Sequence, residues 1–432
     1  MTLIDLGDAT GAAPPAAAPV DLGRLGRLAM AGLSVAGLLA MSASAPPVPS
    51  PVRTLWSTAF RPSETLAADG PTVYVHRDDD GSTVTAYDLA SGRLRWSAPA
   101  GAGPADGGVI PAGDVLLIPT SLSPAGPGPG VIVLDKASGE ELWRSYGDAQ
   151  PSVATGEVLL AETGQNGITT ALRLVGLRDG HEVWKQPIAP AEQWTTLTEN
   201  GRPSSIVAVT AQGDATVYRY ADGTILHRDR IPWNGVYSAA LVPAGPHLIV
   251  VRTASAQTVA TVYRPGDLRP LWRTGELIGS VDGCGPLICA AGVRGVTAYD
   301  AATGRVIWRR DDMNYSWDAG QGRLLLSAAD VTTTVLADTA TGRTVGRPFG
   351  EGTSLLSGGS GSMLMLRAGA TPDGRTGVAR LDLATGRETV LGAVGLPTAE
   401  DCRETPGYLL CTGANTLTVT AVGLPSPEEV GD

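Results

Sequence analysis

A single phrase recurs through the chain and constrains its fold more than any other feature. The full form is VTAYDLASGRLRW, and close copies are VIVLDKASGEELW, LRLVGLRDGHEVW and GVTAYDAATGRVIW. With weaker copies included, the phrase ends at Trp96, Trp143, Trp184, His227, Trp272, Trp308, Gly346 and Val390. Successive copies therefore end 36 to 47 residues apart. A period of that length with several strands per unit is typical of a β-propeller blade rather than of a helical solenoid.

Each copy of the phrase predicts a β-hairpin. An alternating apolar strand runs to an Asp or another polar residue, a short turn contains Gly, and a second strand ends in Trp. The glycine supplies a positive φ, the aspartate can accept backbone N–H bonds, and the indole can cover the seam between neighbouring sheets. The predicted turn and docking residues are Asp88, Gly92, Trp96, Asp135, Gly139, Trp143, Gly180, Trp184, Trp272, Asp300, Gly304, Trp308, Asp338, Gly342, Asp382 and Gly386.

Two further apolar runs precede each hairpin, which predicts four strands per unit. The expected fold is an all-β propeller over residues 52–424, with about eight blades and with seven to nine admissible. The two ends of this region complete one repeat, because residues 419–426 resemble the first strand of the hairpin and residues 52–57 resemble the second. Pairing these segments would close the ring and remove exposed sheet edges.

The N-terminal region predicts a membrane anchor. Residues 1–27 are rich in Ala, Pro and Gly and are expected to form a disordered cytoplasmic tail. Residues 28–45 carry no charge, follow Arg24 and Arg27, and are long enough to be a transmembrane helix with the propeller outside the cell. A cleaved signal peptide and a buried helix are the alternatives. Residues 46–51 read as a proline-rich linker, and residues 425–432 read as a C-terminal tail.

Charge and cysteine content narrow the partners and the compartment. The formal net charge of −11 argues against a nucleic-acid partner. The chain has 4 cysteines, and both pairs occupy the two runs that precede a hairpin. An even count in an extracytoplasmic domain favours disulfides between Cys284 and Cys289 and between Cys402 and Cys411. Free buried thiols and a metal site are the alternatives.

The repeat resembles the tryptophan-docking repeat of the quinoprotein alcohol dehydrogenase-like β-propellers, also known as pyrroloquinoline-quinone repeats. Residues 86–96 and 298–308 match its pattern A-x-D-x-x-[ST]-G-x-x-x-W in full. The chain is most similar to the non-catalytic branch that includes the outer-membrane assembly factor BamB, and its composition and anchor resemble actinobacterial members. The resemblance covers roughly residues 52–424 and implies a propeller without implying an activity.

The same resemblance raises an enzymatic alternative, a quinone-dependent dehydrogenase. Such enzymes hold their quinone with a vicinal Cys–Cys disulfide and a Ca²⁺ ion, and this chain has no adjacent cysteines. The run from Asp78 to Gly81 faintly resembles a calcium loop and is better interpreted as a hairpin turn. The run from Gly358 to Gly361 lacks the lysine of a phosphate loop and is interpreted as a connection between blades. We therefore predict no catalytic residue, metal ligand or cofactor.

Three tryptophans lie outside the docking phrase and are the remaining candidate binding residues. Trp194, Trp233 and Trp317 each lie shortly after a hairpin, where an innermost strand is expected to begin. They are interpreted as core or seam packing or, alternatively, as an aromatic rim of the central channel that receives a peptide or sugar. The sequence as a whole predicts a non-catalytic platform that binds a protein or small ligand at the cell envelope. A quinone-binding enzyme or ligand sensor is the alternative.

Overall fold

The computed structural model describes residues 51–77, 82–100, 108–120, 130–164, 166–233, 238–254, 257–274, 278–357, 361–370, 374–395, 402–413 and 415–423. The chain divides into two compact units, Met1–Pro49 and Ser50–Asp432. The predicted cytoplasmic tail, transmembrane helix and C-terminal tail lie outside the described residues, as do most of the linker, the run from Asp78 to Gly81 and three of the four residues from Gly358 to Gly361. Within the described ranges, no helix is both long and apolar enough to cross a membrane.

The second unit is built of antiparallel β-strands, as the repeat predicts. In order along the chain, the first sheets contain β2 (Thr65–Asp69), β3 (Thr72–Arg77), β4 (Thr83–Asp88) and β5 (Leu94–Pro99); then β6 (Ile110–Ala112), β7 (Val115–Thr120), β8 (Gly130–Asp135) and β9 (Glu141–Tyr146); then β10 (Asp148–Ser152), β11 (Glu157–Thr163), β12 (Thr169–Gly176), β13 (Glu182–Glu199), β14 (Arg202–Thr210), β15 (Asp214–Arg219) and β16 (Ile225–Arg230).

The remaining sheets repeat the four-stranded pattern. They contain β17 (Ser238–Ala244), β18 (His247–Ala254), β19 (Gln257–Arg264) and β20 (Arg269–Arg273); then β21 (Ser280–Cys284), β22 (Leu287–Gly292), β23 (Gly295–Asp300) and β24 (Val306–Arg310); then β25 (Tyr315–Gly320), β26 (Arg323–Ser327), β27 (Thr334–Asp338) and β28 (Thr344–Phe349); then β29 (Thr353–Ser357), β30 (Ser362–Arg367), β31 (Thr376–Asp382) and β32 (Glu388–Val394); and last β33 (Cys402–Thr405), β34 (Tyr408–Gly413), β35 (Thr416–Val422) and β1 (Val52–Ala59).

The described strands thus form eight hydrogen-bonded sheets, seven with four strands and one with seven. The seven-stranded sheet arises because β13 is 18 residues long and pairs with β12 near its start and with β14 over its second half. Two repeats are therefore joined through one continuous strand, with no interruption between the outer strand of one repeat and the first strand of the next.

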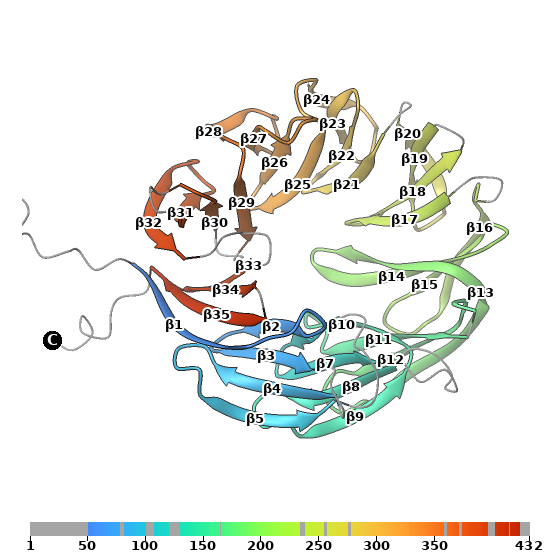
Figure 1. Ribbon diagram of the computed structural model, residues 1–432. Coiled ribbons are helices and arrows are strands. Elements are labelled where there is room, and N and C mark those ends of the chain that lie inside the picture. The colour runs from blue at the N-terminus through green and yellow to red at the C-terminus, as the bar shows by residue number, and fades with distance from the viewer. Residues whose placement is uncertain are drawn as a thin grey trace, which may run out of the picture. The chain divides into compact units, whose positions relative to one another are not determined.

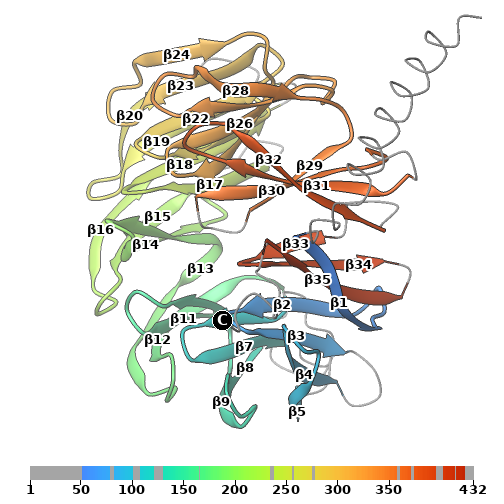
Figure 2. The ribbon, with the colours of Figure 1, turned by 90° about the vertical axis from the view of Figure 1, so that its left-hand side faces the viewer.

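The sheets of the second unit follow one another around a ring (Figure 1). The ring closes because β1 pairs antiparallel with β35, from Val52 opposite Val422 to Ala59 opposite Thr416. The two strands lie side by side in both views, one blue and one red (Figure 2). The sheet they complete packs against β2–β5, since a core cluster includes Val73 and Val75 together with Leu417 and Val419. The predicted β-propeller is confirmed, with strands from both ends completing one sheet.

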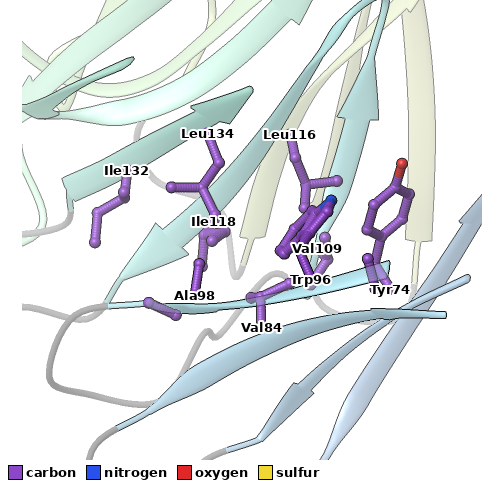
Figure 3. Close-up of a cluster of buried hydrophobic side chains, with 11 residues drawn as sticks. Tyr74, Val84, Trp96, Ala98, Val109, Leu116, Ile118, Ile132 and Leu134 are labelled. Atoms are coloured by element: carbon purple, nitrogen blue, oxygen red, sulfur yellow. The ribbon is translucent and has the colours of Figure 1, made fainter. Parts of the chain in front are cut away.

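The core lies between neighbouring sheets rather than at one centre. At the seam between β2–β5 and β6–β9, Tyr74, Val84 and Trp96 of one sheet meet Leu116 and Leu134 of the next (Figure 3). The central strands are buried on both faces, as in β7, where Val115 to Ile118 are each fully buried. Continuous apolar runs in these strands are what such two-sided burial requires.

The repeat turn is held by its aspartate and its glycine. In the first repeat, the N–H of Gly92 donates to the carbonyl of Asp88 at 2.8 Å, and the Asp88 carboxylate accepts from the N–H of Ser91 at 2.9 Å. A hydrogen bond from Arg95, with help from Ser91, lowers the pKa of Asp88 to about 2. The same carboxylate-to-backbone bond recurs at Asp135, Asp300, Asp338 and Asp382.

Six of the turns receive the tryptophan of the preceding repeat. The indole N–H donates to the carbonyl of the residue at the start of the next turn, as Trp308 does to Thr339 at 2.8 Å. The same bond is made by Trp56, Trp96, Trp143, Trp184 and Trp272. The indole also lies on the glycine of that turn, so closely that a Cβ atom there would come within 3.0 Å of the ring, at Gly92, Gly139, Gly180, Gly223, Gly304 and Gly342. The glycine therefore makes room for the neighbour's indole as well as supplying a positive φ.

Two of the seams that lack a docking tryptophan accommodate its absence in different ways. His227 stands where the tryptophan would be, and Leu268 takes the place of glycine in the next turn, at a φ of 48°. The Leu268 side chain is 2% exposed and packs in the cluster that contains Val217, the strand partner of His227. At the other seam Gly346 replaces the tryptophan, and its backbone lies directly against Gly386. At the first seam a larger side chain in the turn accompanies the loss of the tryptophan, and at the second the two backbones close together instead.

The replacement of Trp by His227 and of Gly by Leu268 predicts that substitutions at these two positions are energetically coupled. Leu268→Gly alone is expected to cost about 1–3 kcal/mol of unfolding free energy, because the cavity it leaves outweighs the relief of a leucine held at a positive φ. His227→Trp alone is expected to be destabilising because the indole would meet the Leu268 side chain. The double variant rebuilds the Trp–Gly pair, so its loss should be smaller than the sum by about 1–2 kcal/mol. Denaturant titration of the four proteins measures this difference, and strictly additive losses would contradict the coupling.

The two cysteine pairs form disulfides, each between the first two strands of a sheet. Cys284 of β21 bonds to Cys289 of β22, with 5.8 Å between their Cα atoms. Cys402 of β33 bonds to Cys411 of β34, which lies directly opposite in the ladder. Each bond ties the inner hairpin of its sheet, as the spacing predicts.

Candidate functional site

The up-and-down order of the strands gives the propeller two different ends. The repeat turns and the turn after the first strand of each sheet lie at one end, here called the turn face. The connections after the second strand and those that lead to the next sheet lie at the other end, here called the loop face. The docking tryptophans serve the turn face, where they hold turns in place. Surfaces free to bind a ligand are expected on the loop face.

Hollows formed by the described residues open between neighbouring sheets on the loop face. The first, of about 730 Å³, lies between β8–β9 and β11–β13. The second, of about 420 Å³, lies beside the starts of β21 and β25. The third, of about 380 Å³, lies where β1 leads into β2, and Cys402 forms part of its wall. Volumes of this size are in the range of small-ligand sites.

The first hollow is polar and contains an ion-pair group, and we call it the basic hollow. Its wall includes Arg144, Tyr146, Glu162, Arg173 and Lys185. Both carboxylate oxygens of Glu162 accept from Lys185 Nζ at 2.8 Å, and Arg173 Nε lies 3.4 Å from Glu162 Oε1. One carboxylate is thus shared by two cations.

The second hollow is apolar, and we call it the aromatic hollow. Ile278, Ala291, Val293 and Tyr315 form much of its wall. Tyr315 stacks on Trp317 with ring centroids 6.0 Å apart, and the two alternate residues of β25 point to the same side of the strand. Tyr315 is 45% exposed, Trp317 50% and Val293 76%. Such a cluster of large exposed apolar groups is the kind that marks a contact surface.

The three tryptophans of the predicted rim differ in their surroundings. Trp233 is 4% exposed and donates to the Glu192 carboxylate at 2.7 Å, so it packs in the core. Trp194 is half-buried against the cluster that contains Leu172. Trp317 alone of the three is largely exposed. The packing interpretation therefore describes Trp233, and the rim interpretation stays a prediction for Trp317, which is the most exposed of the three.

Half-buried polar side chains link strands of neighbouring sheets. The Gln193 amide donates to the carbonyl of Ala239 at 2.9 Å and accepts from the N–H of Leu241 at 3.1 Å. The Glu404 carboxylate accepts from the N–H of Leu364 at 2.8 Å, and burial raises the pKa of Glu404. These bonds satisfy backbone groups of β17 and β30 that face a neighbouring sheet.

The described ranges hold no group of three His, Cys, Asp or Glu side chains suited to a metal ion. A histidine and a serine do meet, with His76 Nε2 lying 2.8 Å from Ser82 Oγ. They are 2% and 3% exposed, so a substrate could not reach them. Their burial makes the pair a structural contact rather than a nucleophile and its base.

Sequence reasoning missed the aromatic hollow and the basic hollow. Tyr315 could have been found, because it lies two residues before Trp317 in a segment expected to be a strand, and alternate residues share a side. The basic hollow had no comparable signal. Glu162 belongs to β11, Arg173 to β12 and Lys185 to β13, so only the pairing of three strands brings them together.

Comparison with known proteins supports the fold. The family model described as outer membrane protein assembly factor BamB matches residues 53–264. No curated protein matches the chain significantly. Among solved structures, BamB from Moraxella catarrhalis is 15% identical, with 86% of this chain and 97% of that chain covered and a TM-score of 0.42. A eukaryotic initiation factor is 11% identical, with 82% and 90% covered and a TM-score of 0.56, which indicates a shared fold.

Proposed function

Because the chain is a β-propeller of the pyrroloquinoline-quinone-repeat type, we propose that it is a non-catalytic scaffold that binds a partner protein through its loop face. The rigid ring fixes the positions of the loops, and the loops vary without disturbing the seams. A protein-binding role also accords with the assembly-factor family that matches half of the ring.

The observation that carries this proposal is the aromatic hollow. Aromatic side chains concentrate binding energy in protein interfaces, where they bury large areas at a small cost in conformational entropy. Tyr315 and Trp317 are stacked, with 21° between their ring planes, on one strand before any partner arrives. An apolar segment of a partner protein can fill the hollow beside Val293 and cover both rings.

The test uses the full chain in its membrane with a photo-crosslinking residue at position 293, which borders the hollow. We expect a discrete crosslinked partner that is lost in the Tyr315→Ser/Trp317→Ser double variant. The matched control is Val390→Ser, which removes an apolar side chain that is 78% exposed on β32, far from the hollow in sequence. Equal crosslinking in all three proteins, or no discrete product at all, would reject the aromatic hollow as the binding surface.

The enzymatic alternative is less well supported by the residues. The chain contains no adjacent cysteines to hold a quinone, and the described His–Ser pair is buried. We expect purified protein mixed with pyrroloquinoline quinone and Ca²⁺ to reduce no dye in the presence of alcohols or sugars. Substrate-dependent dye reduction would assign it to the enzymes instead.

We also propose that residues 28–45 anchor the protein with its propeller outside the cytoplasm. The uncharged run after Arg24 and Arg27 supports this orientation, and so do the two disulfides, because disulfides persist in oxidising compartments. Protease added to intact spheroplasts should remove an epitope placed after Asp432 and spare one placed before residue 24. Protection of both epitopes would place the propeller in the cytosol.

The number of blades belongs to the proposal as well. Dividing β13 between its two repeats gives nine four-stranded units, at the upper limit of the range that the sequence admits, and leaving it whole gives eight sheets. We favour nine, because the two halves of β13 pair with different neighbours. An experimental structure in which one strand pairs on both sides along its full length would favour eight.

A further inference from the structure

The basic hollow carries an excess of positive charge in an acidic protein. Its wall contains Arg144, Arg173 and Lys185 and one carboxylate, Glu162, whereas the chain as a whole has a net charge of −11. Glu141 neutralises Arg144 from outside the hollow, with 2.6 Å between Arg144 Nε and Glu141 Oε1. Arg173 and Lys185 are left to share Glu162, so one positive charge remains without a counter-charge in the wall.

The Arg173 side chain is 20% exposed, so part of it remains accessible from the basic hollow. Its guanidinium donates to the Ser145 hydroxyl and, at 3.3 Å, to the carbonyl of Tyr146. Its Nε is buried and faces the Glu162 carboxylate at 3.4 Å, so a ligand would meet the Nη end of the guanidinium. Lys185 is 42% exposed, so its ammonium group can turn from Glu162 toward an incoming anion. Charge-assisted bonds of this kind are the strongest polar contacts available to a ligand.

The rest of the wall adds hydroxyl groups and one aromatic ring. Ser145, Thr163 and Thr170 contribute hydroxyls that can both donate and accept, and Tyr146 is 56% exposed at the end of β9. A flat, half-exposed ring offers an apolar surface with a polar tip. A ligand that matches this wall carries a negative charge, several hydroxyls and one flat apolar side. Inorganic anions lack the last two properties.

We propose that the basic hollow is a binding site for an acidic saccharide. The carboxylate of a uronic acid would bind Lys185 and Arg173, the C–H side of the sugar ring would lie on Tyr146, and the sugar hydroxyls would bond to the threonines. The hollow, of about 730 Å³, has room for a short oligosaccharide. The basic hollow is separate from the aromatic hollow, so saccharide binding can be tested independently of the proposed scaffold function.

The experiment is calorimetric titration of the full chain in detergent with trigalacturonate, maltotriose and inorganic phosphate. We expect trigalacturonate to bind. Maltotriose lacks the carboxylate and phosphate lacks the sugar ring, so each should bind at least about tenfold more weakly. Binding of trigalacturonate should weaken as salt is raised. Phosphate binding as tight as that of trigalacturonate would reduce the hollow to a simple anion site and overturn the proposal.

Variants locate the binding. Lys185→Met should weaken trigalacturonate by about tenfold, as expected for loss of a charge-assisted bond. Tyr146→Ala should weaken trigalacturonate while leaving phosphate binding unchanged. The matched control is Arg178→Gln, which removes the same charge from a side chain that is 55% exposed on the turn face. If Arg178→Gln weakens binding as much as Lys185→Met, the net charge rather than the hollow is responsible, and the assignment fails.

Discussion

The Gly342→Ala variant is expected to lose about 3 kcal/mol of unfolding free energy, although it adds a single methyl group. The new Cβ atom would lie 2.6 Å from the Trp308 ring, which is 9% exposed and cannot swing into solvent without breaking its hydrogen bond to Thr339. The alanine must also adopt a φ of +67°, which is costly for a residue with a side chain. Overpacking and backbone strain therefore act together.

A matched glycine separates the two effects. Gly352 has a φ of +73° but no atom within 4 Å of its would-be Cβ, so Gly352→Ala should cost only the backbone term of about 1–2 kcal/mol. Denaturant titration of the three proteins, followed by tryptophan fluorescence, measures the difference. Equal losses in the two variants would mean that the indole yields easily and that the close packing of Trp308 on the turn contributes little to stability.

Deleting Val52–Ala59 is expected to abolish the cooperative unfolding transition of the propeller. The deletion removes the β1–β35 ladder and the hydrogen bond from Trp56 to Leu89, and it leaves β35 as an unpaired edge. Loss of one docked tryptophan and one strand of backbone bonds amounts to more than about 5 kcal/mol, which is comparable to the whole stability of a typical domain. Circular dichroism melting and size-exclusion chromatography should show a broad transition and self-association.

Rescue in trans makes this prediction specific to ring closure. A synthetic peptide covering residues 50–61 should add to β35 and restore a cooperative transition, because strand addition uses the same backbone bonds. The same peptide with Trp56→Ala should restore it only in part. A deletion protein that melts like the full chain would show that the ring does not depend on its closing strand.

Much of this fold could be predicted from the sequence because the repeat is local. Asp88, Gly92 and Trp96 lie within one hairpin, and their spacing alone specifies the turn and the strands on each side. The closure by β1 followed from the same phrase, split between the two ends of the chain. The disulfides followed because each cysteine pair lies within one hairpin.

The features that sequence reasoning missed depend on contacts between repeats. Leu268 departs from the pattern of its own repeat, and its packing is explained only by Val217 of the preceding repeat, the strand partner of His227. The basic hollow likewise requires Ser145 of one sheet to meet Arg173 of the next. Such contacts have no fixed separation in sequence, so a repeat pattern specifies the units more fully than it specifies what lies between them.

The long strand β13 bears on how a chain of this kind can change its length over evolution. Elsewhere in the ring each repeat begins and ends in a loop. One repeat could therefore be duplicated or deleted with both junctions lying in loops. Within β13 the outer strand of one unit passes into the inner strand of the next without a joint. Relatives of different size should therefore gain or lose the two units that share β13 as a pair, while single units vary elsewhere in the ring.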